Sequence, residues 1–204
     1  MSDIQKVFIA VSIIIILIII FLYIYHPIKN IYGRHRYHKI YRFILNVISK
    51  EKKCILLNNL ALPIGGNNFI HIDHLLFADK YIYVIKDRYI SGSLEALENN
   101  RYWFSYNLKG EQTAISNSLS VNQERIDKLA LLTGVEHNLF VNVVLLNDNC
   151  NLAPTNISKP NTYIIKLRYF KSFLRKKESQ NVAPLNRIQL EKLANDIARL
   201  SQIN

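Results

Sequence analysis

Two neighbouring stretches decide the fold: FIHIDHLLFA at residues 69–78 and YIYVIKDRY at residues 81–89. Both are rich in Ile, Val, Tyr and Phe, which favour β-strands, and only the polar pair Asp79 and Lys80 separates them. Because two residues are enough to join antiparallel strands, the pattern predicts a β-hairpin. A loop of three residues would shift the pairing of the strands.

A two-residue turn also decides which side chains of the hairpin share a face. It places Asp73 opposite Lys86 and His71 opposite Arg88. Directly opposed residues lie on the same face of an antiparallel pair, so we expect these four side chains to form one cluster. Asp87 has the opposite parity and is expected on the other face.

Around the hairpin, extended runs alternate with amphipathic helices. Apolar residues spaced by three and four predict helices at residues 31–49, 121–132, 169–176 and 188–201. Further strands are expected at residues 54–62, 140–146 and 162–167, with a meander at 92–110. The nearly continuous apolar run at 140–146 predicts a strand buried on both faces. This order predicts an α/β (α+β) domain whose mixed central sheet is flanked by helices.

The N-terminal region contains an uncharged run at residues 7–25. As a helix this run would reach about 28 Å, close to the ~30 Å hydrocarbon core of a bilayer. It ends in aromatic residues and lacks a cleavage site, which favours an uncleaved transmembrane helix over a signal peptide. We therefore expect a membrane anchor at residues 1–28, a basic amphipathic helix at 29–53 and one α/β domain at 54–204.

The charges beside this run predict its orientation. Lys6 and Asp3 precede it, and the residues after it include the bases Lys29, Arg34, Arg36, Lys39, Arg42, Lys50, Lys52 and Lys53. Bases are retained on the cytoplasmic side, so we expect a single-pass protein of the cell (plasma) membrane with its N-terminus outside and its C-terminal domain in the cytoplasm. Arg34, Arg36, Lys39 and Arg42 are candidate ligands of anionic membrane lipid, each contributing about 1 kcal/mol.

Composition points to an anionic partner and away from a cysteine-based metal site. The formal net charge is +11, and a second basic cluster covers residues 168–177. DNA, RNA and lipid headgroups all fit this charge. Cys54 and Cys150 lack a C-x-x-C spacing, so no zinc site is expected. His71, Asp73 and His74 resemble a metal triplet, but His74 is expected on the opposite face of its strand.

Several of these segments together resemble a known family. They are residues 72–76, 81–88 and 91–94, Trp103, the segment 117–123 with its following helix, and the strand 140–146. The chain resembles the nuclease-related domain, NERD, a branch of the PD-(D/E)xK nuclease superfamily, over about residues 33–167. The resemblance implies an Asp on the first hairpin strand and a Glu-x-Lys on the second, which together bind a divalent metal beside the scissile phosphate. It also assigns Gln123 to the family's helix motif.

The sequence departs from this pattern at the catalytic positions. Asp73 is retained, but the Glu position holds Lys86, the Lys position holds Arg88, and the helix Glu falls near Tyr37. Mg²⁺ needs carboxylate ligands, whereas an ammonium at this position would pair with Asp73. The departure predicts no cofactor and no metal site.

The leading interpretation is a membrane-anchored NERD-like domain that has lost metal-dependent catalysis and binds nucleic acid through a basic former active site. The expected nucleic-acid-binding residues are Lys86, Arg88, His71 and Gln123. A second interpretation is that Lys86 and Asp73 form an ion pair that only stabilises the hairpin.

Two further functions stay open. One is an active nuclease that uses Asp73 with Mg²⁺ or Mn²⁺, and with Asp87 if the strand carries a bulge. The other is a membrane scaffold that binds anionic lipid or protein partners. The sequence predicts neither a pathway nor a preference between DNA and RNA.

Overall fold

The computed structural model describes residues 3–66 and 68–202, with side chains at 12–21, 36–66 and 68–201. The chain divides into two compact units, Met1–Lys39 and Ile40–Asn204. Helix α1 (Asp3–Lys52) belongs to both units and is continuous. The helix predicted at residues 31–49 is therefore part of a longer one, and the second unit begins inside that predicted segment.

In the first unit, the described side chains are mainly apolar. Those of residues 13–21, eight Ile or Leu followed by Phe21, are 47–63% exposed. Among the residues whose side chains are described, no helix is long and apolar enough to cross a membrane. The transmembrane helix predicted at residues 7–25 lies partly outside these residues, because only 12–21 of it carry described side chains.

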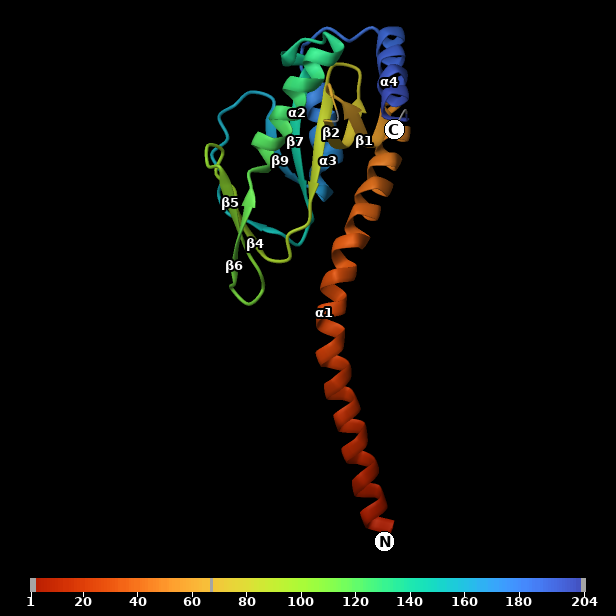
Figure 1. Cartoon of the computed structure of the whole chain (residues 1–204), viewed down its shortest axis with the longest axis vertical. Helices are drawn as coiled ribbons and strands as arrows, with labels where there is room; N and C mark the ends of the chain where they lie inside the picture. The colour runs from red at the N-terminus through yellow and green to blue at the C-terminus, as the bar shows by residue number, and fades with distance from the viewer. Residues whose placement is uncertain (1–2, 67, 203–204) are drawn as a thin grey trace. The chain divides into compact units, whose positions relative to one another are not determined.

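The second unit is built on a five-stranded mixed sheet (Figure 1). Its strands, in spatial order, are β1 (Ile55–Pro63), β2 (Phe69–Phe77), β3 (Ile82–Arg88), β7 (Phe140–Leu146) and β9 (Thr162–Lys166). The pairs β1–β2 and β2–β3 are antiparallel, whereas β3–β7 and β7–β9 are parallel. Every residue of β7 is buried, which confirms the burial predicted for this strand.

The predicted hairpin register is confirmed. Strands β2 and β3 pair from His74 with Ile85 to Phe77 with Ile82. Beyond this ladder, the Ala78 amide donates a hydrogen bond of 3.0 Å to the Tyr81 carbonyl, so Asp79 and Lys80 form the turn. The same register places Asp73 across from Lys86.

A smaller four-stranded sheet has the spatial order β6-β5-β4-β8. Its strands are β4 (Ser93–Glu95), β5 (Tyr102–Tyr106), β6 (Gln112–Ser116) and β8 (Asn151–Leu152). Two of these strands were not predicted. β6 is polar and mostly exposed, so it lacks an apolar alternation. β8 has only two residues and forms within an Asn-rich loop by pairing with β4.

Helices cover both faces of the main sheet. On one face, α2 (Ser118–Thr133) packs Ile126 and Leu129 against Ile82 and Val84. The alternate residue Tyr83 faces the other side, where its ring lies 6.3 Å from that of Phe173 in α3 (Phe170–Glu178). The last helix, α4 (Arg187–Gln202), packs against β1. Two short 3-10 helices, η1 (His137–Leu139) and η2 (Leu167–Tyr169), complete the unit.

Helix α2 begins earlier than predicted because it has a strong N-cap. The Asn117 side chain accepts hydrogen bonds from the amides of Leu119 and Ser120, so the helix starts at Ser118. It ends as predicted at Gly134, which has a φ of 68°. This cap determines where the first turn of α2 meets β3.

The C-terminal part of α1 belongs to the core of the second unit. Tyr41, Leu45 and Ile48 are 1–5% exposed. The Tyr41 hydroxyl donates a hydrogen bond of 3.0 Å to the carbonyl of Arg88, at the end of β3. This stretch of α1 is therefore anchored next to the strand that carries the candidate site.

Candidate functional site

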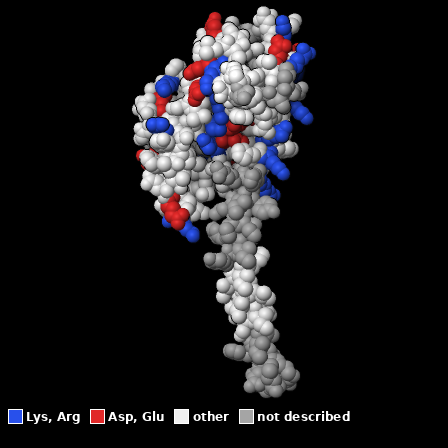
Figure 2. Space-filling model, in the orientation of Figure 1, with Lys and Arg blue, Asp and Glu red and all other residues white. Residues whose placement is uncertain are grey.

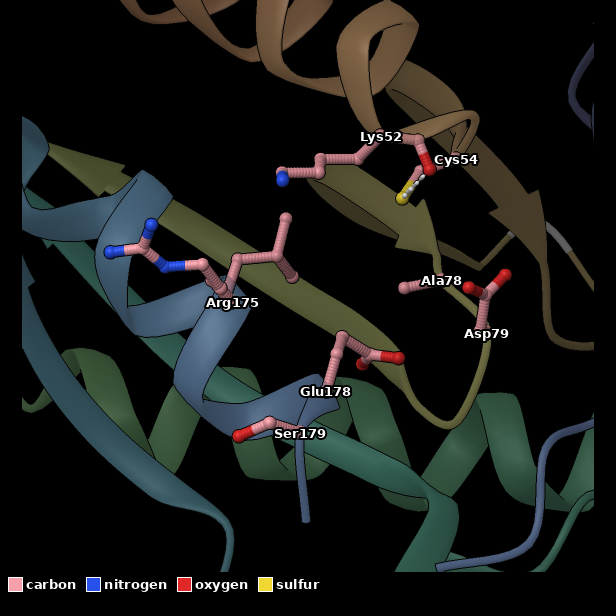
Figure 3. Close-up of a pocket in the computed structure, with 8 residues that line it drawn as sticks. Lys52, Cys54, Ala78, Asp79, Arg175, Glu178 and Ser179 are labelled. Atoms are coloured by element: carbon pink, nitrogen blue, oxygen red, sulfur yellow. Dashed lines mark hydrogen bonds between the residues drawn. The ribbon is translucent and has the colours of Figure 1, made fainter.

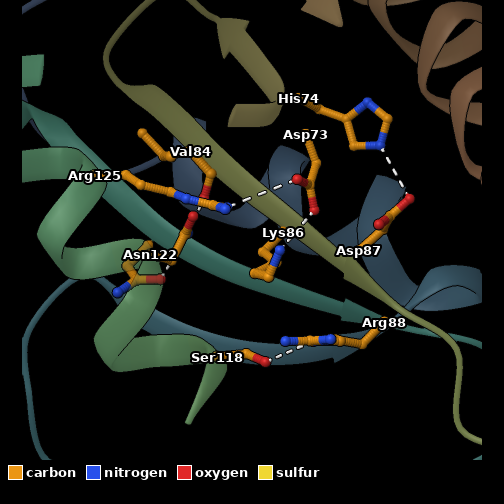
Figure 4. Close-up of polar contacts among 10 residues, drawn as sticks. Asp73, His74, Val84, Lys86, Asp87, Arg88, Ser118, Asn122 and Arg125 are labelled. Atoms are coloured by element: carbon orange, nitrogen blue, oxygen red, sulfur yellow. Dashed lines mark hydrogen bonds and ion pairs between the residues drawn. The ribbon is translucent and has the colours of Figure 1, made fainter. Parts of the chain in front are cut away.

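The carboxylate of Asp73 lies between two cations (Figure 4). The Lys86 ammonium lies 3.1 Å from Oδ2 of Asp73, and Nη1 of Arg125 lies 3.7 Å from Oδ1. The three side chains are 24%, 12% and 15% exposed, respectively. Strands β2 and β3 therefore supply one ion pair, and α2 supplies the second cation.

A third cation, Arg88, lies on β3, the strand that carries Lys86. Nε of Arg88 donates a hydrogen bond of 2.8 Å to Oγ of Ser118, the first residue of α2. Arg88 and Lys86 are two residues apart on β3 and so share a face. We call Asp73, Lys86, Arg88 and Arg125 the Asp73 cluster.

The cluster carries excess positive charge. Burial lowers the pKa of Lys86, and the neighbouring Arg125 and Arg88 lower it further, whereas Asp73 opposes them. Nη1 of Arg125 is buried and has no hydrogen-bond partner among the described residues, because its distance to Asp73 exceeds hydrogen-bond length. One carboxylate thus contacts two cations, and Arg88 is a third cation near Lys86.

Amide side chains hold α2 in place over the cluster. Nδ2 of Asn122 donates to the Val84 carbonyl at 2.7 Å and to Oδ1 of Asn142 at 2.9 Å. Nδ2 of Asn142 in turn donates to the Leu119 carbonyl at 3.0 Å. These buried bonds join α2 to β3 and β7, and so position Arg125 beside Asp73.

The other face of the hairpin carries a separate buried pair. Nε2 of His74 lies 3.5 Å from Oδ2 of Asp87, and their side chains are 4% and 2% exposed. Nδ1 of His74 lies 2.7 Å from Oδ1 of Asn58. As predicted from strand parity, His74 and Asp87 face away from Asp73, so the carboxylate of Asp87 does not join that of Asp73.

A comparison of the chain with models of known families identifies the family to which it belongs. The model of the nuclease-related domain, NERD, matches residues 34–147. The chain belongs to the NERD family. The match contains β2, β3, α2 and β7, and therefore the whole Asp73 cluster. No curated protein and no solved structure matches the chain.

Two predicted site residues lie away from the cluster of this NERD domain. His71 is exposed and pairs through its backbone with Ala61 of β1. The ladder between β2 and β3 ends at His74, so His71 does not form the predicted pair with Arg88. The Gln123 side chain bonds to other residues, since its Nε2 donates to Asp127 at 2.9 Å and its Oε1 accepts from Nδ2 of Asn142 at 3.4 Å.

Arg125 and Ser118 were missed as site residues, although the sequence of the NERD domain contains a signal for them. Ser118, Asn122 and Arg125 are spaced by four and three, which places polar side chains on one helix face. An amphipathic helix normally buries apolar residues on the face that packs on a sheet. Polar residues on the face of α2 that packs on the sheet therefore indicated a functional site there.

The cluster does not fit a divalent metal. Both oxygens of Asp73 already contact cations, and the side chain opposite Asp73 on β3 is the ammonium of Lys86, which is no metal ligand. Within the described part of the chain, no three His, Cys, Asp or Glu side chains are grouped to hold a metal ion. A divalent ion at Asp73 would displace Lys86 and Arg125 and would be repelled by both.

The predicted lipid ligands belong to both units of the NERD protein. Arg36 and Lys39 are exposed in the first unit, and Arg42 is exposed in the second. The side chain of Arg34 lies outside the described residues. Their role as lipid ligands stays a prediction.

Proposed function

We propose that this NERD domain binds the phosphate groups of nucleic acid through the Asp73 cluster, without cleaving the strand by metal catalysis. The observation that carries the proposal is the charge of the cluster, in which Lys86 and Arg125 both contact the carboxylate of Asp73 and Arg88 lies near Lys86 on the same strand face. Guanidinium and ammonium groups gathered in this way favour a phosphate, whose oxygens accept charge-assisted hydrogen bonds.

Among the residues of the cluster, Arg125 would gain most from a bound phosphate. Its Nη1 is buried without a hydrogen-bond partner in the described structure, and leaving a buried donor unbonded costs about 1–3 kcal/mol. A phosphate oxygen beside Arg125 would remove that cost. The net charge of +11 supports an extended polyanion as the partner, and basic side chains recur across the face of the second unit in Figure 2.

The test is binding by the full-length chain in detergent. Fluorescence anisotropy with labelled single-stranded and double-stranded DNA and RNA, in chelator and in Mg²⁺ or Mn²⁺, would measure affinity, and gels of the same samples would measure cleavage. Binding is expected to weaken steeply with salt and not to require metal. Arg125→Gln should weaken it about tenfold.

Lys128→Gln is the matched control for Arg125→Gln. Lys128 is a base of the same helix that pairs with Glu124 on the exposed side. Equal affinities for the two variants would reject the cluster as the binding site. Metal-dependent cleavage that is lost in Asp73→Asn would replace the proposal with an active nuclease.

We further propose that the first unit anchors the protein in the cell membrane, with the second unit in the cytoplasm. The proposal is supported by the uncharged run at residues 7–25 and by the exposure of the side chains of residues 13–21, which water does not favour. Resistance to alkaline carbonate extraction tests it. Leu17→Arg should release the protein into the soluble fraction, whereas Val7→Arg, at the first residue of the uncharged run, should release much less.

A further inference from the structure

Two adjoining hollows lie between the end of α1 and α3, on the face of the sheet opposite the Asp73 cluster. One has a volume of about 260 Å³ and the other of about 340 Å³. Both are lined by Lys52, in the last turn of α1, and by Arg175, in α3. We call the two hollows together the α1–α3 groove. Figure 3 shows the smaller hollow, with Lys52 and Arg175 reaching toward the same side of it.

The larger hollow is strongly cationic. Its lining includes Lys52, Arg168, Lys171 and Arg175. Two of these bases have partners: Arg168 Nε lies 3.4 Å from Asp148, and Lys171 Nζ lies 2.7 Å from Glu51. Within the described part of the chain, neither Lys52 nor Arg175 forms an ion pair. Two cations without partners therefore share one concave surface.

Helix-end electrostatics alone do not account for this arrangement. A base in the last turn of a helix is favoured by the helix dipole, which explains Lys52 and Arg175 separately. It does not explain why two such bases from distant segments line the same hollow. Lys177, which belongs to the basic cluster at residues 168–177, has its own contacts. Its Nζ donates to Asn161 and lies 4.5 Å from the centre of the Tyr81 ring.

The opposite end of the groove is acidic. Asp79 and Glu178 line the smaller hollow, and Cys54 lies beside them. Oε1 of Glu178 accepts a hydrogen bond of 2.5 Å from the Tyr83 hydroxyl, which fixes this carboxylate in place. Burial raises the pKa of Cys54 to about 11, so the thiol stays neutral and is no nucleophile. The groove thus has a cationic end and an acceptor end.

We infer that the α1–α3 groove binds a phosphate monoester, with its phosphate between Lys52 and Arg175 and its organic part toward Asp79 and Ser179. A monoester carries close to two negative charges and three terminal oxygens, which match the two cations without partners. A backbone diester carries one charge and is part of a long chain, whereas each hollow has the volume of a small molecule. An organic part that carries donors, such as the ribose hydroxyls or the amino group of adenosine, suits the acceptor end.

The monoester could be free or could end a nucleic acid, and titration calorimetry of the full-length chain distinguishes the two sources. The probes are inorganic phosphate, adenosine, adenosine 5′-monophosphate, and one oligonucleotide with and without a 5′-phosphate. Adenosine monophosphate should bind at least tenfold more tightly than adenosine. A preference for the phosphorylated oligonucleotide would identify a terminal phosphate, and binding of the mononucleotide alone would identify a free ligand.

Variants locate the site. Arg175→Gln and Lys52→Gln should each weaken binding of adenosine monophosphate about tenfold, which corresponds to the loss of one charge-assisted contact. Lys176→Gln, an exposed neighbour of the same charge, should leave it unchanged. Circular dichroism would confirm that the variants are folded, and Lys52→Arg, which keeps the charge, should retain binding.

The inference would be overturned by equal affinity for adenosine and its monophosphate, or by equal losses in Arg175→Gln and Lys176→Gln. It stands apart from the Asp73 cluster, because Lys86→Gln should weaken binding of nucleic acid without changing binding of adenosine monophosphate. The two sites can therefore fail separately.

Discussion

Lys86 holds its ammonium 3.1 Å from the Asp73 carboxylate, across the two central strands of the sheet. The resemblance to the NERD pattern assigns an acidic metal ligand to the position of Lys86, where this chain has an ammonium group. This face of the sheet carries more positive than negative charge, because Arg125 also contacts the Asp73 carboxylate and Arg88 lies near Lys86.

Asp73→Asn should lower the free energy of unfolding by about 2 kcal/mol. This cost lies between the cost of breaking an exposed ion pair and that of breaking a buried one. The physical reason is that Lys86 and Arg125 lose the carboxylate that both contact. Urea denaturation followed by circular dichroism measures the change. The double variant Asp73→Asn with Lys86→Met should recover part of the lost free energy of unfolding. Asp127→Asn, at a carboxylate that is 52% exposed, is the control and should cost much less.

The double variant Lys86→Glu with Arg88→Lys should acquire a divalent site, because it supplies a second carboxylate beside Asp73 and rebuilds the family's Glu-x-Lys. Calorimetric titration with Mn²⁺ checks this, with Lys86→Gln as the variant that removes the cation without adding a ligand. We expect binding in the double variant alone. Equally tight binding of Mn²⁺ by the wild type would show that the cluster never lost its metal.

Glu178 should make stability depend on pH. Burial raises its pKa above the usual 4.5, although its bonds to Tyr83 and Lys80 oppose this. The folded state therefore favours the protonated carboxyl, so the contribution to stability is complete below the unfolded pKa and is lost as pH rises through the folded pKa.

The Glu178→Gln variant tests this sign. Between about pH 4 and about pH 8, wild type should lose stability relative to the variant as pH rises. Thermal unfolding across that range measures the difference. Glu191→Gln, at an exposed carboxylate paired with Arg187, should not change the profile. The prediction would be contradicted if the wild type gained stability relative to Glu178→Gln as pH rises.

Asn122 should matter more for stability than its neighbour Gln123. Asn122 is fully buried and bonds to Val84 and Asn142, so Asn122→Ala leaves buried polar groups unpaired and should cost about 2 kcal/mol. Gln123→Ala removes an exposed bond to Asp127 and a long bond of 3.4 Å from Asn142, so it should cost less, about 0.5–1 kcal/mol. Guanidinium denaturation of the two variants gives the comparison.

The sequence by itself determined the parts of this protein that depend on neighbouring residues. A two-residue turn and a period of two placed Asp73 across from Lys86 and sent Asp87 to the other face, and the structure confirms both. The continuous apolar run of β7 likewise predicted its burial. These inferences hold because strand geometry is set locally.

Only the tertiary structure decided which distant side chains meet. Arg125 reaches Asp73 because buried amides hold α2 on the sheet. Lys52 and Arg175 line the same hollow because the end of α1 lies beside α3, to which the ion pair of Glu51 with Lys171 joins it. The short strand β8 exists only through its pairing with β4. Periodicity describes one segment at a time, whereas the packing of separate segments sets the positions of charges that come from different parts of the chain.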